Sequence, residues 1–241
     1  EFHSLYNEDV RAGDLIDRYD VIVLADIRGR SIMEGAAKGT VPPRYAGGIG
    51  SEGVRALDAF VRAGGTLVCF NNSSLFAIDQ LHLPVRNVVA GLETKEFFSS
   101  GSILEVLVDR SHPIMSGMPQ RSKITVTRSP VFTTTEKFKG VALAKYAGAG
   151  SPLLSGYLLG EEKLHGYAAA LDVFHDKGHV ILLGFRPQWR GQPFGTFKIL
   201  FNSLLFHGAH ADDKVGDGEF WEAPKEKKKD AEEEKTTARQ D

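Results

Sequence analysis

The only cysteine of the chain, Cys69, closes a short apolar run that leads into a predicted helix. Several enzyme classes hold a nucleophile at such a junction, because a tight turn presents the side chain while backbone amides face the developing oxyanion. Cys69 lies inside the predicted strand, however, and bulky Phe70 separates it from the turn. We therefore predict that Cys69 is a buried, unreactive thiol.

The apex of the turn carries amide and hydroxyl side chains, namely Asn71, Asn72, Ser73 and Ser74. A serine nucleophile needs a histidine within hydrogen-bond reach and an orienting acid, and the G-x-S-x-G surround of a serine elbow is absent. Asparagine and serine at such a place typically cap a helix or form a turn. We predict a degenerate elbow without a nucleophile. The alternative is a hydrolase in which Ser73 or Ser74 works with His112 as the base.

A second candidate site is the loop "GFRPQWRGQ", residues 184–192, which follows an apolar predicted strand. Ligands of open α/β sheets bind at the carboxyl ends of strands. Side chains of this loop that suit a carboxylate, a sugar, a peptide or a partner chain are Arg186, Gln188, Trp189 and Arg190. The alternative, left open, is a structural loop whose arginines pair with carboxylates at the sheet end and whose tryptophan covers the core.

Two further motifs could in principle hold a metal or a cofactor. The stretch "DVFHDKGH" offers Asp172, His175, Asp176 and His179 as zinc ligands, but it spans a predicted hairpin turn, where polar side chains are usually solvated. The G-x-G-x-x-G pattern of residues 48–53 follows a loop instead of a strand, unlike a dinucleotide-binding fingerprint. We predict neither a bound metal nor a cofactor.

Composition limits the class of protein. With 241 residues, 42% of them hydrophobic and 25% charged, the chain can bury one full core. Its formal net charge of −2 provides no basic face for nucleic acid or for an anionic membrane, so we expect neither as a partner. The longest apolar runs are too short to cross a bilayer.

Strand and helix patterns alternate in the first half of the chain. Residues 19–27 form the apolar, β-branched run of a buried parallel strand, residues 51–65 an amphipathic helix, and residues 66–70 the next strand. This order predicts a right-handed crossover and a parallel sheet. After about residue 100, short strand-like runs predominate, which predicts added antiparallel strands.

The end of the chain divides into a last helix and a charged tail. The inward stripe of the helix is predicted to consist of Phe197, Leu200, Phe201 and Leu204. Residues 213–241 mix both charges with almost no apolar periodicity. They predict a solvated, disordered tail behind a domain of residues 1–212.

Several separate stretches together resemble the class I glutamine amidotransferase-like fold, in the branch near the ThuA-like proteins. More closely, they resemble the C-terminal accessory domain of bacterial zinc carboxypeptidases. The stretches are "YDVIVLADI", "YAGGIGSEGVRALDAFVRAGGTLV", "SILEVLVDRSHPIMSGMP" and "GHVILLGFRPQWRGQPFGTFKILFNSLLF". The resemblance implies a flavodoxin-like, three-layer α/β fold with a parallel sheet and antiparallel strands added in the second half.

The resemblance also implies a role. Catalytic members of the family carry cysteine at the elbow, and the matching position here is Asn71, or Asn72 if the register slips by one. This implies a non-catalytic accessory domain that serves ligand binding or assembly beside an upstream zinc peptidase domain, in a periplasmic or secreted protein. No histidine of this chain is followed by the glutamate of an H-x-x-E zinc motif. The alternative is a ThuA-like or serine-type hydrolase acting on a sugar or a peptide.

The resemblance carries one expectation about the beginning of the chain. Folds of this family usually open with a strand and a helix before the strand that "EFHSLY", residues 1–6, is expected to form, and this sequence leaves no room for them. We therefore expect an open sheet edge or apolar face, and homodimerisation as its consequence.

Overall fold

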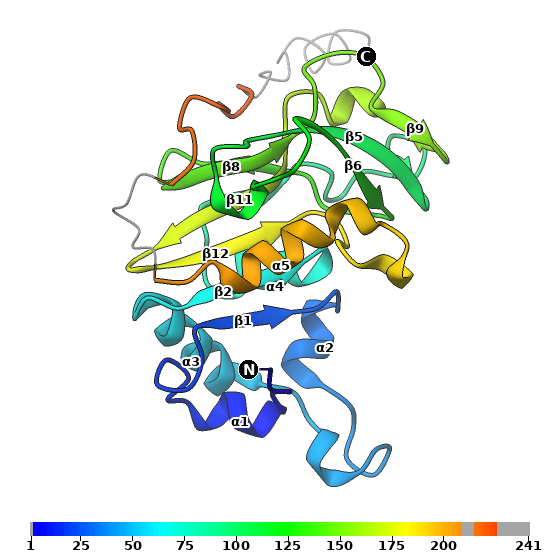
Figure 1. The fold of residues 1–241 in the computed structure, drawn as a ribbon. Helices are drawn as coiled ribbons and strands as arrows, with labels where there is room; N and C mark the ends of the chain where they lie inside the picture. Colours follow the sequence, from blue (N-terminus) through cyan, green and yellow to red (C-terminus); the bar gives the residue numbers. More distant parts are fainter. Residues whose placement is uncertain (1, 209–214, 226–241) are drawn as a thin grey trace, which may run out of the picture.

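A computed structural model describes residues 2–208 and 215–225 of the chain. Its main sheet has the strand order β1-β2-β12-β11-β8-β5-β6 (Figure 1). The parallel part comprises β1 (Val21–Leu24), β2 (Thr66–Phe70) and β12 (Gly178–Leu183). The antiparallel part comprises β11 (Ala168–His175), β8 (Gly140–Lys145), β5 (Ser102–Val108) and β6 (Arg121–Val126).

Short strands complete the β-structure. Those attached to the main sheet are β3 (Val85–Asn87), β7 (Phe132–Thr134) and β9 (Leu153–Ser155). A separate two-stranded sheet pairs β4 (Phe98–Ser99) with β10 (Leu158–Leu159).

Helices cover both faces of the sheet. The helices are α1 (Asn7–Ala12), α2 (Gly29–Glu34), α3 (Gly50–Arg62), α4 (Asn72–Gln80) and α5 (Phe197–Leu205). Apolar side chains of α1 to α4 pack on one face, in the core that contains Leu67 and Cys69. Helix α5 covers the other face, and the second core, around Val68 and Phe70, lies between this helix and the sheet (Figure 1). The predicted fold class, a three-layer α/β sheet with antiparallel strands in its second half, is confirmed.

Local sequence explains the crossover from β1 to β2. Helix α3 buries Leu57, Phe60 and Val61, and the chain then reverses at Gly64, whose φ of +116° is open to glycine alone. A Cβ on Gly65 would lie 2.4 Å from the Phe60 ring. The paired glycines therefore let β2 start directly beneath the helix that precedes it.

Helix α5 differs from the prediction. Its buried residues are Ile199 and Ser203, whereas Phe201 and Leu204, which we placed on the inward stripe, are 57% and 41% exposed. The helix carries apolar residues on most of its circumference, so its hydrophobic pattern did not define one inward face. Packing against the loop of η2 (Pro113–Met115), where Asn202 donates to the Ile114 carbonyl at 2.9 Å, sets the rotation of the helix.

Part of the predicted tail lies against the domain. The indole N–H of Trp221 donates to the Gly166 carbonyl at 2.7 Å, and the ammonium group of Lys145 lies 4.5 Å from the centroid of the Phe220 ring. Residues 215–225 therefore differ from the solvated tail that we expected, while 213–214 and 226–241 lie outside the described residues. Within the described ranges, no helix combines the length and apolar character that a membrane span requires.

Candidate functional site

The elbow between β2 and α4 has Asn71 at its apex. This residue adopts φ 51° and ψ −112°, a backbone conformation that non-glycine residues rarely occupy, and its amide donates to the Leu183 carbonyl of β12 at 2.7 Å. Strained backbone of this kind is typical of functional turns and persists only when the surroundings fix it. The backbone geometry of an elbow is therefore present, and its apex residue is an asparagine.

Neither serine of the elbow has a free hydroxyl. The Ser73 hydroxyl lies 2.8 Å from the Leu24 carbonyl and accepts from the Phe70 amide at 2.8 Å. The Ser74 hydroxyl lies 3.0 Å from the Cys69 carbonyl. Both side chains are buried and bridge the strand ends, which is the structural role of a capping residue and not the exposed position of a nucleophile.

Cys69 lies in the middle of the packed interior. Its side chain is fully buried in the core beneath α3 and α4, and this burial raises the pKa of the thiol. A thiol that is neutral and enclosed has neither the thiolate character nor the access that a nucleophile requires.

Asp26, just beyond the end of β1, holds the elbow in place. Its carboxylate accepts from the Asn72 amide at 3.1 Å, from Asn72 Nδ2 at 2.9 Å and from Asn71 Nδ2 at 3.2 Å, and it pairs with Arg186. Burial by itself would raise the pKa of Asp26, but these donors outweigh it and hold the pKa below its ordinary value. One ionised carboxylate thus joins the ends of three parallel strands.

The loop after β12 divides its side chains between two roles. The Arg186 guanidinium faces Asp26 and lies 4.4 Å from the centroid of the Trp189 ring, while that of Arg190 lies 5.1 Å from the same centroid. Gln188 and Arg190 are exposed, and Trp189 is half-buried. The structure therefore combines both readings of the loop: Arg186 pairs internally, while Gln188, Trp189 and Arg190 face solvent beside the elbow.

One polar atom of the elbow lacks a partner. Among the described residues, no donor reaches the buried Oδ1 of Asn71. The amide cannot be reversed, because Nδ2 donates to Asp26 and a flip would set two oxygens against each other. The elbow therefore presents an unsatisfied acceptor where a nucleophile would otherwise stand.

A cleft of about 460 Å³ opens beside the elbow, between α2 and α4. Its polar lining includes Arg28, Asn72 and Asp79, and its apolar lining includes Met33 and Phe76. Polar and charged residues outnumber apolar ones in the lining, which also includes Arg30, Glu34 and Gln80, so the cleft is mainly polar.

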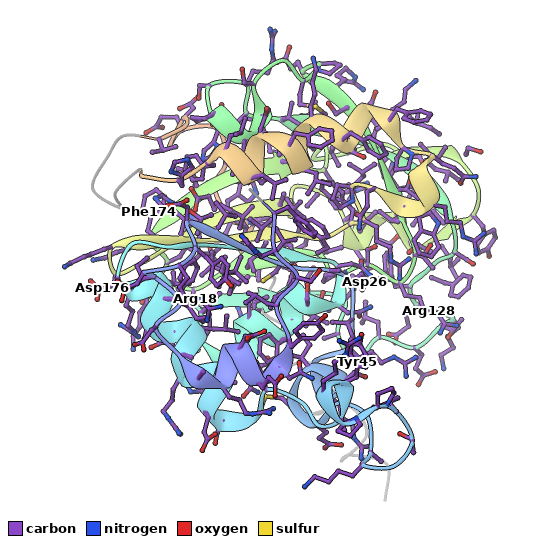
Figure 2. The ribbon with its side chains drawn as sticks, turned by 60° about the horizontal axis from the view of Figure 1, so that its bottom comes forward. Arg18, Asp26, Tyr45, Arg128, Phe174 and Asp176 are labelled. Atoms are coloured by element: carbon purple, nitrogen blue, oxygen red, sulfur yellow. The ribbon has the colours of Figure 1, made fainter. Side chains whose placement is uncertain are left out.

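The candidate base His112 lies far from the elbow, in a buried cluster with Asp172 and His179. Asp172 accepts from His112 Nε2 at 3.2 Å and from His179 Nδ1 at 2.9 Å. In the sheet, His179 lies beside Thr66, the first residue of β2, whereas Asn71 directly follows the last residue of that strand. At about 3.3 Å per residue, these two positions are roughly 17 Å apart. In Figure 2, the labelled Asp26 lies on one side of the sheet, and the labelled Phe174 and Asp176 lie on the other.

The hydrogen bonds assign the protons of this cluster. His112 Nδ1 accepts from the Ile114 amide at 3.2 Å, so His112 donates to Asp172 through Nε2. Burial would raise the pKa of Asp172, but the hydrogen bonds from both histidines outweigh it and lower the pKa. The cluster lies beneath Phe206 of the α5 layer, so its position indicates a structural role.

The metal-binding stretch considered from the sequence is divided in the structure. His179 joins Asp172, whereas His175 bonds Asp58 of α3 at 2.6 Å and Asp176 stands exposed in the hairpin turn. In the described part of the chain, no group of three or more histidine, cysteine, aspartate or glutamate side chains is arranged to hold a metal ion.

The sequence-based prediction missed Asp26, the central residue of the site. A signal was present, since "VIVLAD" ends an apolar parallel strand with an acid. An acid directly after such a strand lies at the ligand-binding edge of the sheet.

No protein-family model and no curated protein matches the chain. Among solved structures, a cytoplasmic protein from Salmonella typhimurium is similar with 14% identity and a TM-score of 0.48, over 83% of this chain and 78% of that one. A protein from Thermoplasma acidophilum, provisionally designated as part of a GMP synthase, gives 12% and 0.44, over 82% and 76%. A protein from Bacteroides uniformis, provisionally designated ThuA-like, gives 11% and 0.43, over 86% and 76%.

All three likenesses have TM-scores below 0.5 and identities of 14% or less, so they carry no argument about this chain. None of the three structures is named as a carboxypeptidase domain, so that part of the resemblance stays a proposal.

The burial of Cys69 gives a first prediction. Ellman's reagent should leave the native protein unlabelled over hours and should titrate one thiol per chain after unfolding, because the thiol is neutral and enclosed. A Cys69→Ala, Glu162→Cys double variant, with its thiol at an exposed position, is the control and should react at once. Rapid labelling of native wild type would show that the elbow carries an accessible thiol.

The Asp26–Arg186 pair gives a second prediction. Arg186→Met should lower the free energy of unfolding by about 2 kcal/mol, since it leaves a mostly buried carboxylate without its cation. Arg30→Met, which breaks an exposed pair with Glu34, is the matched control and should leave stability unchanged. Urea denaturation measures both. Equal stabilities for the two variants would contradict the anchoring role of Asp26.

The Asp172 cluster gives a third prediction. Asp172→Asn should destabilise the fold by about 3 kcal/mol at neutral pH, because a buried network loses its charge. The pKa of Asp172 is lowered on folding, so its contribution is complete above the unfolded value of about 3.9 and is lost as the pH falls through the folded value. The difference between wild type and variant should therefore shrink in acid.

The control for this pH series lies on the same hairpin. Asp176 is exposed with φ 59°, a conformation that asparagine also tolerates, so Asp176→Asn should match wild type at every pH. A difference between wild type and Asp172→Asn that grows in acid would overturn the assignment of Asp172 as the ionised centre.

Proposed function

We propose that this chain is a non-catalytic, glutamine amidotransferase-like accessory domain of a zinc carboxypeptidase-like protein, and that its elbow and the adjoining loop bind part of a peptide substrate. The zinc centre of such a protein lies outside these residues. The domain contributes recognition, and the peptidase domain contributes the chemistry.

The elbow carries this proposal. Its strained backbone is retained at Asn71, while the thiol of Cys69 is enclosed and both serine hydroxyls serve backbone carbonyls. The candidate base His112 does not accompany the elbow, because it belongs to the cluster at the other end of the sheet. A turn that keeps its costly shape without a nucleophile or base is consistent with binding and not with covalent catalysis.

The chemistry around the elbow suits a peptide with a free carboxylate. Arg190 offers an exposed guanidinium beside the half-buried Trp189, and Arg28 offers another at the cleft. Among the described residues, neither arginine has a carboxylate partner. The exposed guanidinium groups and the stacking surface of Trp189 thus match the carboxylate and a side chain of a peptide terminus.

A covalent-probe experiment tests the absence of catalysis. The purified chain is incubated with a fluorophosphonate and with iodoacetamide, and its intact mass is measured. We expect no stoichiometric adduct, because the hydroxyls of Ser73 and Ser74 and the thiol of Cys69 are all buried. An adduct on any of these three side chains would overturn the proposal in favour of a hydrolase.

Peptide binding gives the fourth prediction. Trp221→Phe leaves Trp189 as the only indole, so its fluorescence reports on the loop. In this background, a hexapeptide with a free carboxyl terminus should quench the emission, and its C-terminal amide should bind at least tenfold more weakly. Arg190→Gln should weaken binding of the free acid to a similar extent, whereas Arg55→Gln, an exposed arginine of α3, should not. Equal binding of acid and amide would contradict carboxylate recognition.

A further inference from the structure

A second pocket, of about 200 Å³, lies between α4, the loop after β3 and the loop after β6. Leu75 of α4 lines both this pocket and the cleft beside the elbow, so the two hollows adjoin each other. We call it the β6-loop pocket. Its apolar wall consists of Leu75, Val89, Leu92, Phe97, Phe98 and Pro130.

The β6-loop pocket lies at the same end of the sheet as the elbow. Strand β6 is connected to β12 through β5, β8 and β11 by four antiparallel pairings, so β6 and β12 run in the same direction. The loops that follow them meet, since a Cβ on Gly184, directly after β12, would lie 2.5 Å from the Pro130 carbonyl oxygen. In Figure 2, the labelled Arg128 lies on the same side of the sheet as Asp26. This is the end at which open α/β sheets bind ligands.

The polar part of the lining offers a cation and hydrogen-bond donors. Arg128 is exposed, and in the described part of the chain no carboxylate pairs with its guanidinium. Asn87 Oδ1 accepts from the amides of Val89 at 3.3 Å and Val131 at 3.0 Å, so the side-chain atom left for a ligand is the donor Nδ2. The other polar residues of the lining carry hydroxyl groups, namely Thr94, Ser99 and Ser129.

Ser99 is a buried polar residue without a side-chain partner. It is 3% exposed, and its hydroxyl forms no hydrogen bond with another described residue. Its carbonyl accepts from the Arg128 amide at 3.2 Å, which holds the serine beside the arginine. Arg128 itself adopts φ 49°, a left-handed conformation that glycine tolerates better. Because buried polar groups normally have partners, a hydroxyl that lines a pocket without one points to a ligand.

We propose that the β6-loop pocket binds a small apolar molecule that carries a single carboxylate. A cavity of about 150 Å³ holds one benzene ring, so a pocket of about 200 Å³ has room for a ring and a carboxylate. The rings of Phe97 and Phe98 suit the apolar body. Arg128, Asn87 Nδ2 and the Ser99 hydroxyl suit the anion.

The charge of the lining sets the charge of the ligand. Among the described lining residues there is one cation, Arg128, and no acid, so the pocket matches one negative charge. A phosphate dianion would bring a second charge against an apolar wall, which is costly without a second cation. The inference does not depend on the proposed function, because Arg28, Trp189 and Arg190 do not line this pocket.

NMR spectroscopy of the ¹⁵N-labelled chain tests the proposal. 3-Phenylpropionate should shift the amide signals of Val89, Ser99 and Ser129, and the neutral 3-phenylpropionamide should bind at least tenfold more weakly. The amide signal of Arg190, in the loop that the proposed function uses, should stay in place. Equal binding of acid and amide, or shifts confined to the loop of Arg190, would overturn the proposal.

Variants of Arg128 separate binding from folding. Arg128→Gln should weaken binding of the acid at least tenfold, whereas Arg110→Gln, an exposed arginine in the loop after β5 at the opposite end of the sheet, should not. Arg128→Gly should also lose binding and should still melt close to wild type, because glycine favours φ 49°. Unchanged binding of the acid by both Arg128 variants would contradict the proposal.

The tripeptide Gly-Gly-Phe distinguishes two sources of this chemistry, since it presents the same ring and carboxylate at the end of a peptide. Binding at least tenfold tighter than that of 3-phenylpropionate supports the pocket as a site for a peptide terminus. Equal or weaker binding supports a free acid, and no binding of either ligand overturns the proposal. The proposed function fails separately, if the hexapeptide leaves the emission of Trp189 unchanged.

Discussion

The carboxylate of Asp26 is the constraint on which the candidate site depends. Three parallel strands end at one edge of the sheet, and the turns that follow them bring polar groups into a partly enclosed space. Asp26 accepts from the elbow through Asn71 and Asn72 and pairs with Arg186 of the loop after β12. Because hydrogen-bond donors surround it, the carboxylate of Asp26 stays ionised despite its burial. The elbow keeps its shape through this anchor and not through catalytic partners.

A second buried carboxylate performs the same task at the opposite end of the sheet. Asp172 joins His112 of the loop after β5 to His179 at the start of β12, beneath the ring of Phe206. The two networks share a principle, since each places one anion among donors drawn from distant segments. They differ in access: the Asp26 network adjoins a cleft, whereas the Asp172 cluster is enclosed. Recognition is therefore possible at one end of the sheet, and the other end is structural.

The surfaces of the domain follow from the same layered construction. Among the described residues, four helices cover one face of the sheet and α5 covers the parallel strands on the other, and apolar side chains of β1 and of the outer side of α5 remain partly or largely exposed. The layered construction therefore leaves apolar side chains exposed at β1 and on α5.

The sequence by itself determined the crossover of strands and helices, the elbow at Asn71 and the burial of Cys69. These features depend on apolar period, turn residues and glycine placement over short spans, which local steric rules govern. Only the tertiary structure decided that Asp26 pairs with Arg186, that His112 joins Asp172 and His179, and that α5 turns Ile199 inward. Asp26 and Arg186 are 160 positions apart, and such partners are set by strand order and helix rotation. An apolar pattern that surrounds a helix leaves that rotation undetermined until the neighbouring elements are in place.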